Sequence, residues 1–102
     1  MIKYYVSVID DEIVGMVQTI AEMDLRVGGL IYWINCVYVK EENRKQGIYK
    51  SIHNYIIDEA QKDPACLCVR LFTNPRNKVA IKTYQNLGMV PVDYDGFLEF
   101  SI

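Results

Sequence analysis

The stretch Arg44-Lys45-Gln46-Gly47-Ile48-Tyr49-Lys50 lies between an apolar, β-like run that ends near Val39 and an amphipathic, helical run. We predict that a polar turn over residues 40–43 leads into this stretch and that a helix begins close to Gly47. The N–H groups at a helix start have no intrahelical partners, and the helix dipole adds partial positive charge there. Glycine lets a ligand approach this backbone closely, and the three basic side chains add full charges. Together these features predict a phosphate-sized anion site.

The bulk composition is that of an ordinary globular chain. It has 102 residues, of which 51% are hydrophobic and 24% are charged, and its formal net charge is −2. We predict one domain over residues 1–102, with a core just large enough to fold alone. The small negative charge argues against nucleic acid and anionic membrane as partners. The sequence shows neither a signal-peptide pattern nor a run of about 20 apolar residues, so we expect a cytoplasmic protein.

The residues that could hold a metal are few. The chain has three cysteines, Cys36, Cys66 and Cys68, and one histidine, His53. They form no Cys-x-x-Cys pair, so we predict no metal site and expect reduced, mostly buried thiols. His53 falls on the mostly polar side of its helix, where we expect a solvated or half-buried side chain.

Hydrophobic periodicity predicts the element order β-β-β-α-β-α-β(-β). Strands are expected over residues 2–9, 13–20, 30–39 and 65–72, with a turn over residues 22–29 and short final strands at 89–92 and 97–102 around an Asp95-Gly96 hairpin turn. Gly15, inside the second strand, indicates a bulge or a close backbone approach. The strands at 30–39 and 65–72 are expected to pair in parallel across the helix between them, which gives an α/β fold on a mixed sheet.

Two helices are expected. The first runs from about Gly47 to Asp63-Pro64, and its apolar stripe is expected to contain Ile48, Ile52, Tyr55, Ile56 and Ala60. The second begins near Asn77 and ends at Gly88, which supplies a left-handed C-terminal residue.

Two motifs resemble those of a known family. Val37-Tyr38-Val39 followed by Arg44-x-x-Gly47-Ile48 resembles motif A of the GNAT acetyltransferase superfamily, and Asn77-x-x-Ala80-x-x-x-Tyr84-x-x-Leu87-Gly88-Met89 resembles its motif B. The motifs occur in the family's order, separated by one helix and one strand, and the match covers about residues 34–89. The resemblance implies a GNAT-like, mostly antiparallel mixed sheet with two packing helices.

The resemblance also implies a function, an acetyl-CoA-dependent N-acetyltransferase that acts on a small-molecule or peptide amine. An amine would attack the acetyl group directly, a main-chain N–H near Val37 would polarise the carbonyl oxygen, and Tyr84 would protonate the leaving thiolate as general acid. The pyrophosphate would lie on the amides of residues 45–50. The residues implied to bind the cofactor are Val37, Tyr38, Val39, Arg44, Lys45, Gln46, Gly47, Ile48, Tyr49, Lys50 and Asn77.

Three features depart from the family's pattern. Tyr49 stands where the family usually has Gly or Ala, so the phosphate cradle is expected to differ slightly. Trp33 stands where histone-type members carry a glutamate base, which leaves the base unassigned; Glu22 and Asp24 could act through water or could be solvated turn residues. The chain begins almost at the first hairpin, as a short form without the usual N-terminal strand and helices, so the acceptor site is expected to be open or completed by a second copy.

Other interpretations remain open for these residues and for the chain. Residues 44–50 could be a charged helix start, Tyr84 could be a core residue, and Asn77 could simply cap its helix. The alternative function is a non-catalytic acyl-CoA-binding or interaction module, and a third is a domain for another phosphorylated ligand. A homodimer is also expected, because the apolar first strand would lie at a sheet edge.

Overall fold

The computed structural model describes residues 1–26, 28–92 and 99–101. The chain forms two compact units, Met1–Phe72 and Thr73–Ile102, and each is described by itself. The predicted Asp95-Gly96 turn lies outside the described residues. The single domain over residues 1–102 stays a prediction.

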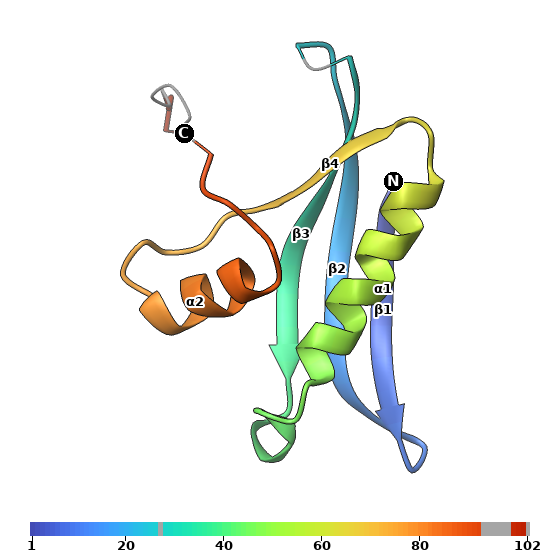
Figure 1. Ribbon diagram of the computed structural model, residues 1–102, viewed down its shortest axis with the longest axis vertical. Coiled ribbons are helices and arrows are strands. Elements are labelled where there is room, and N and C mark those ends of the chain that lie inside the picture. The colour runs from blue at the N-terminus through green and yellow to red at the C-terminus, as the bar shows by residue number, and fades with distance from the viewer. Residues whose placement is uncertain (27, 93–98, 102) are drawn as a thin grey trace. The chain divides into compact units, whose positions relative to one another are not determined.

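The first unit is built on a four-stranded sheet in the order β1-β2-β3-β4 (Figure 1). The strands are β1 (Ile2–Ile9), β2 (Glu12–Asp24), β3 (Gly29–Val39) and β4 (Cys66–Leu71). β1, β2 and β3 pair in antiparallel fashion, and β4 pairs in parallel with β3. The predicted mixed, mostly antiparallel sheet is therefore confirmed, including its parallel pair across a helix.

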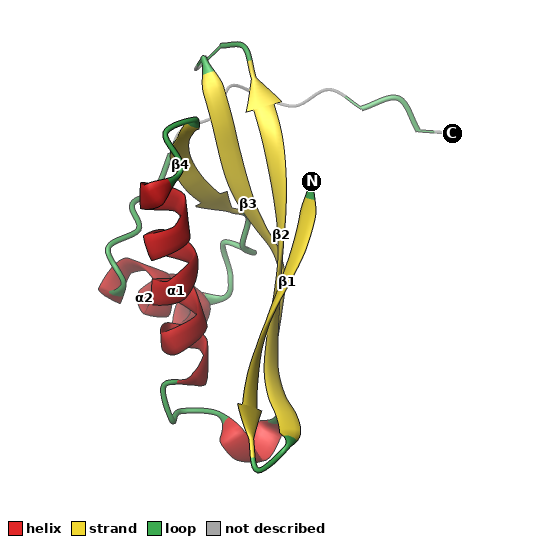
Figure 2. Ribbon diagram, turned by 90° about the vertical axis from the view of Figure 1, so that its right-hand side faces the viewer, coloured by secondary structure: helices red, strands yellow, loops and turns green. Residues whose placement is uncertain are grey.

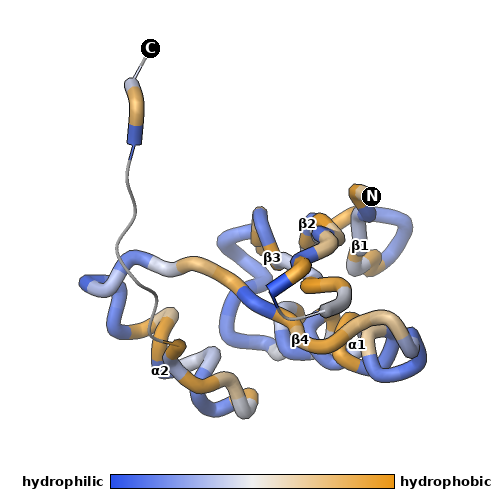
Figure 3. Tube along the Cα trace, turned by 90° about the horizontal axis from the view of Figure 1, so that it is seen from above, coloured by the Kyte–Doolittle hydropathy of each residue, from blue (hydrophilic) through white to orange (hydrophobic). Residues whose placement is uncertain are grey.

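That helix is α1 (Ile48–Lys62), which follows the short 3-10 turn η1 (Glu41–Asn43). α1 covers one face of the sheet (Figure 2), and Figure 3 shows both hydrophobic and hydrophilic segments along it. The buried cluster between the helix and the sheet consists of Val17, Ile34, Ile52 and Ile56. Since burial of apolar side chains is the main favourable term in folding, this cluster fixes α1, and with it the loop that precedes α1.

A polar contact ties the end of α1 to the sheet. The hydroxyl of Tyr32 on β3 donates a hydrogen bond to the carboxylate of Asp63, the residue that ends α1. This bond holds the pKa of the Asp63 carboxyl below its usual range and raises the pKa of Tyr32. Tyr32 and Ile34 therefore mark the face of β3 that α1 covers.

The buried stripe of α1 is rotated relative to the prediction. Its buried residues are Ile52, His53, Ile56 and Ala60. Tyr55, expected in the stripe, is 59% exposed, although its ring meets that of Tyr5 edge-on. His53 is only 1% exposed, so the expectation of a solvated or half-buried side chain is wrong. Burial lowers the pKa of this imidazole, because a charged ring would lose its hydration.

Gly15 brings α1 close to β2. It lies beside a β-bulge in the pairing of β1 with β2, and a Cβ atom on it would come within 2.7 Å of Ile48 Cγ2. Both expectations for this glycine, a bulge and a close approach, are therefore confirmed. The missing side chain lets the first turn of α1 pack directly on the strand.

The turn between β2 and β3 is shorter than predicted. β2 continues to Asp24 and β3 begins at Gly29, because Glu22 pairs with Ile31 and Asp24 with Gly29. The predicted turn over residues 22–29 is therefore wrong at its start, and only residues 25–28 connect the two strands.

β1 is an edge strand, as predicted, and every second side chain along it is apolar and exposed. These side chains are Ile2, Tyr4, Val6 and Val8. Exposed edges of this kind favour pairing with another chain, so the homodimer stays a prediction.

The three cysteines are free thiols, with Cys36 exposed and Cys66 and Cys68 half-buried, so the expectation of mostly buried thiols is wrong. Among the described residues, no group of three His, Cys, Asp or Glu side chains is arranged to hold a metal ion. The helices of the described part are too short or too polar to cross a membrane.

The second unit contains α2 (Lys78–Asn86). Its C-terminus is the predicted glycine motif, because Gly88 has a φ of +92° and Met89 donates its N–H to the Tyr84 carbonyl. The strand predicted over residues 89–92 is absent, and the described residues 99–101 are not in a strand either. Pro91 has no N–H to donate to a strand ladder, which argues against the first of these strands.

Candidate functional site

The loop between β3 and α1 turns twice through the left-handed region. Lys45 and Gly47 have φ angles of +62° and +80°. Gly47 is the N-cap residue of α1, and no side chain caps this helix start. The first helical bond joins Ser51 N–H to Gly47 O at 3.0 Å, so earlier N–H groups of the first turn have no intrahelical acceptor. The helix start thus has the geometry of an anion site.

Three basic residues flank this helix start in the sequence. Arg44, Lys45 and Lys50 are exposed, and none of them forms an ion pair with another described residue. Arg44 Nε donates to Val39 O at 3.1 Å, which holds the guanidinium at the end of β3. Their charges add to that of the helix dipole, with Arg44 and Lys45 on the loop and Lys50 in the first turn of α1.

Polar contacts keep the loop in shape. Gln46 Nε2 donates to Glu42 O at 3.2 Å and so ties the loop back to η1. Lys40 forms ion pairs with Glu12 and Glu42. Lys40 thereby balances the charge of Glu42, the acid nearest in sequence to Arg44, and the three cations do not.

Tyr49 fits the loop in spite of its size. Its ring packs against the buried cluster and meets the His53 ring edge-on, with centroids 5.4 Å apart. The Tyr49 hydroxyl and His53 Nδ1 are 2.9 Å apart, within hydrogen-bond distance. The ring is therefore packed into the core, and its bulk does not fill the space in front of the helix start.

β3 runs past its parallel partner. The pairing of β3 with β4 ends at Ile34 and Leu71, whereas β3 continues to Val39. β2 still pairs with this last part on the other side, up to Gly15 and Val39. Among the described strands, none pairs with residues 36–39 on the β4 side.

The backbone of β3 presents polar groups to this open side. Lys40 N–H donates to Val14 O of β2 at 2.9 Å, whereas Val39 O accepts from Arg44. Since successive residues of a strand point their backbone groups to opposite sides, Val37 and Val39 face the open side and Tyr38 faces β2. A ligand on the open side can therefore bond to the main chain of Val37 and Val39.

Tyr84 and Asn77 lie in the second unit, in α2 and at its start. Asn77 Oδ1 accepts a hydrogen bond from Ala80 N–H at 3.1 Å, so the interpretation of Asn77 as a helix cap is confirmed. Tyr84 is half-buried, and burial raises the pKa of its hydroxyl. The hydroxyl is therefore protonated at neutral pH, as a general acid must be.

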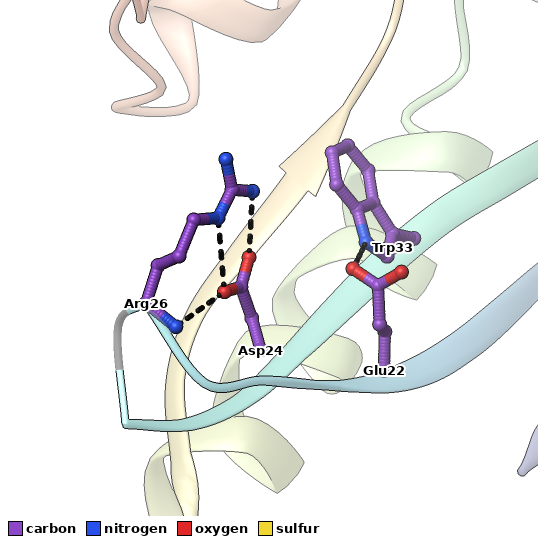
Figure 4. A network of polar contacts seen from close by, with 4 residues as sticks. All are labelled: Glu22, Asp24, Arg26 and Trp33. Carbon is purple, nitrogen blue, oxygen red and sulfur yellow. Dashed lines mark hydrogen bonds and ion pairs between the residues drawn. The ribbon is translucent and has the colours of Figure 1, made fainter.

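The two candidate bases differ in their surroundings (Figure 4). Asp24 is 8% exposed, and its carboxylate accepts bonds from the backbone N–H, Nε and guanidinium NH2 of Arg26, at 2.8, 3.3 and 3.0 Å. Glu22 is exposed and accepts a bond from Trp33 Nε1 at 3.1 Å. Asp24 thus closes the turn between β2 and β3, whereas Glu22 stands in solvent beside Trp33.

Sequence reasoning missed two aromatic contacts. The rings of Trp33 and Phe72 are stacked, with centroids 4.8 Å apart and planes 9° from parallel. The parallel pairing of β3 with β4, which α1 separates in the sequence, creates this contact, so no short-range pattern could have indicated it. The contact of Tyr49 with His53 could have been predicted from the sequence, because residues four apart share a helix face.

A family model described as the acetyltransferase (GNAT) family matches residues 2–89. The chain belongs to this family. The resemblance read from the two motifs is therefore confirmed, and the match covers most of the chain.

Solved structures agree with this assignment. A possible acetyltransferase from Clostridium difficile 630 is 32% identical, with a TM-score of 0.89, and the match covers 99% of this GNAT chain and 66% of that one. A protein described as a transcriptional regulator from Bacillus halodurans C-125 is 25% identical, with a TM-score of 0.83 and coverage of 97% and 66%. The chain thus spans just under two thirds of these relatives.

Arabidopsis thaliana Naa50 shares the fold, with 24% identity, a TM-score of 0.76 and coverage of 88% of this chain and 58% of that one. A comparison with curated proteins gave no significant match.

Proposed function

We propose that this GNAT protein transfers an acetyl group from acetyl-CoA to the amine of a small molecule or peptide. The observation that carries the proposal is the uncapped start of α1, where Arg44, Lys45 and Lys50 lie beside the open side of β3. Family membership supports it, and the Naa50 structure contains a bisubstrate analogue, CoA-Ac-MVNAL.

Each part of the carrier has a proposed place. The pyrophosphate lies on the N–H groups of residues 45–50, where the helix dipole and the basic side chains favour negative charge. The pantetheine arm runs along β3 and bonds to the main chain of Val37 and Val39. Asn77 is also proposed to contact the pantetheine, because its amide oxygen caps α2 and its amide nitrogen still has N–H groups to donate.

The chemistry is a direct transfer. The amine nitrogen attacks the acetyl carbon, a C–N bond forms, and the C–S bond breaks as the tetrahedral intermediate collapses. A main-chain N–H near Val37 stabilises the negative charge on the carbonyl oxygen. Tyr84 donates its proton to the departing thiolate, and the amine loses its proton to solvent or a nearby base. None of the cysteines acts as a nucleophile.

The alternative is a non-catalytic module that binds an acyl-CoA. Trp33 favours this alternative, because an indole cannot act as a base at the position where a carboxylate is expected. The Bacillus halodurans relative described as a transcriptional regulator is also consistent with a role other than catalysis.

Two measurements test the proposal. Calorimetry with coenzyme A is expected to show binding, and acetyl-CoA mixed with a panel of amines is expected to release free thiol only when protein is present. Coenzyme binding without thiol release from any amine would favour the non-catalytic module.

A thermal-shift comparison of coenzyme A with ATP and NAD tests the carrier itself. A specific ligand raises the apparent stability by mass action, so coenzyme A is expected to give the largest shift. A larger shift with ATP or NAD would assign the loop to another phosphorylated ligand.

A further inference from the structure

We propose that the acceptor binds in a pocket beside Glu22 and Trp33 and that this pocket selects a small primary amine with one positive charge next to a short apolar carbon chain. The inference rests on the proposed acetyltransferase function and adds the acceptor class to it.

The pocket has a volume of about 290 Å³. Its lining residues are Ile20, Glu22, Trp33, Ile34, Asn35 and Phe72. This volume is at the lower end of the range for small-molecule sites, about 300–1,000 Å³, so it suits a compact acceptor.

The charged and aromatic side chains of the pocket lie on the face of the sheet opposite α1, whereas Ile34, which also lines it, points toward α1. Tyr32 and Ile34 point toward α1, and Trp33 between them therefore points to the other face. Ile20 pairs directly with Trp33 across the two strands, and Glu22 follows two residues along β2 on the same face. Rigid strands therefore supply both the carboxylate and the ring.

Glu22 gives the pocket its charge. One of its oxygens is held by Trp33 Nε1 at 3.1 Å, as Figure 4 shows, and no described cation forms an ion pair with this carboxylate. The bond fixes the direction of the carboxylate and leaves its full negative charge for a ligand. A single carboxylate matches a single ammonium group, which donates up to three hydrogen bonds.

Trp33 and Phe72 form the apolar wall. Their stacked rings, with centroids 4.8 Å apart, present a flat surface beside the carboxylate, and Ile20 adds an aliphatic contact. An aromatic face attracts a cation and also packs against the carbon atoms next to it. The wall therefore favours an amine on an apolar chain over a free ammonium ion or a heavily hydroxylated amine.

The pocket is continuous with the strand that is proposed to hold the carrier. Trp33 and Asn35 lie on β3 just before Val37, and a strand advances about 3.3 Å per residue, so Asn35 is about 7 Å from Val37 along β3. Asn35 is the extra residue of a β-bulge, because Gln18 pairs with Cys36 and Thr19 with Ile34. Glu22 pairs with Ile31, about 20 Å from Val37 along β3, so an amine that enters beside Glu22 passes Trp33 and Asn35 to reach the proposed thioester path.

Trp33 makes the inference testable, because it is the single tryptophan of the chain. Its indole N–H gives one NMR signal that reports directly on the bond to Glu22. We would titrate the full chain, without coenzyme and at constant pH, with butylamine and, separately, with butanol. Butylamine is expected to shift the indole signal in a saturable way, whereas butanol, which has the same chain length and no charge, is expected to leave it nearly unchanged.

The variant Glu22→Gln keeps the shape of the side chain and removes its charge. It is expected to weaken butylamine binding about tenfold, as loss of a charge-assisted hydrogen bond predicts. Glu59→Gln on α1 removes the same charge elsewhere in the first unit and is expected to leave binding unchanged. In the transfer assay, Glu22→Gln is expected to raise the KM for butylamine while the KM for acetyl-CoA stays the same.

Equal effects of butylamine and butanol, no effect of either, or unchanged butylamine binding by Glu22→Gln would each overturn the inference. These outcomes are separate from a failure of the proposed function, which would appear as an absence of coenzyme binding or of transfer to any amine. If Glu22→Gln and Glu59→Gln both transfer acetyl groups with the same KM for butylamine, the proposed function stands and the assignment of this acceptor pocket is wrong.

Discussion

The two α-helices in the described part of the chain begin in opposite ways. α2 begins at Asn77, whose side chain accepts the N–H of Ala80 and so satisfies one N–H group of the first turn. α1 begins at Gly47, which offers no side chain, and three basic residues accompany it. A capped start needs no ligand, whereas an uncapped start beside cations gains stability when an anion supplies the missing acceptors. Under the proposed function, the start of α2 serves the fold and the start of α1 serves binding.

The largest expected effect comes from closing the start of α1 with a carboxylate. Gly47→Asp would place negative charge where the pyrophosphate is proposed to lie, and the repulsion is expected to weaken coenzyme A binding about 100-fold or more. Calorimetry measures this loss of affinity for coenzyme A. Gly88→Asp is the matched control, because Gly88 also has a positive φ and open space around it, and this variant is expected to keep the affinity. Equal affinity losses in both variants would contradict the assignment of the loop.

Tyr84→Phe tests whether the second unit takes part in the chemistry. Loss of a general acid is expected to lower kcat about 10- to 100-fold, while coenzyme affinity stays the same. Tyr55→Phe, which changes an exposed tyrosine of α1, is expected to leave kcat unchanged. A wild-type kcat in Tyr84→Phe would remove Tyr84 from the mechanism.

The same residue predicts the alkaline pH dependence of kcat. Burial raises the pKa of Tyr84 above the ordinary tyrosine value of about 10, and the acid is active only while it is protonated. The activity that depends on Tyr84 is therefore expected to be complete at neutral pH and to be lost only above pH about 10. A pH profile of kcat that falls near pH 8 in the wild type and in Tyr84→Phe alike would assign that fall to another group.

A smaller effect is expected when single cations of the loop are removed. Arg44→Ala or Lys45→Ala is expected to weaken coenzyme A binding about threefold to fivefold, because exposed charge pairs contribute little individually. The difference from the wild type is expected to shrink in high salt, which screens these charges. Lys62→Ala, at the other end of α1, serves as the control. Binding isotherms at two salt concentrations measure both effects, and a difference that does not depend on salt would contradict the electrostatic explanation.

The smallest effect is expected when the start of α2 is opened. Asn77→Ala removes the cap and is expected to lower the free energy of unfolding by about 1 kcal/mol, whereas Asn77→Ser keeps a capping oxygen and most of that stability. Denaturant unfolding measures this change. If Asn77 also contacts the carrier, both variants are expected to raise the KM for acetyl-CoA; a KM change in neither would leave the cap as its sole role.

The sequence predicted those features that depend on neighbours along the chain. The start of α1 at Gly47, the glycine motif after α2 and the close approach at Gly15 each follow from a single residue with a local conformational effect. The two motifs, read together, identified the family, which the match over residues 2–89 confirms.

Features that depend on the third dimension were not predictable in this way. His53 is buried because α1 is rotated on the sheet by its packing with β2 and β3, and helical periodicity alone does not determine that rotation. The strand extension to Asp24 depends on its pairing with Gly29 across the turn. The pocket at Glu22 requires Trp33 and Phe72 to come together from β3 and from the end of β4.

The parallel pair of β3 and β4 has a consequence for folding kinetics. β1, β2 and β3 join neighbours through short turns, whereas β4 can pair with β3 only after the whole of α1 has closed a long loop. Contacts between residues that are distant in sequence form slowly, because the entropy of loop closure must be lost first. The meander is therefore expected to form early and the β3–β4 edge late. A ligand that binds along this edge would slow its opening, and hydrogen exchange at the amides of β4 would report the change.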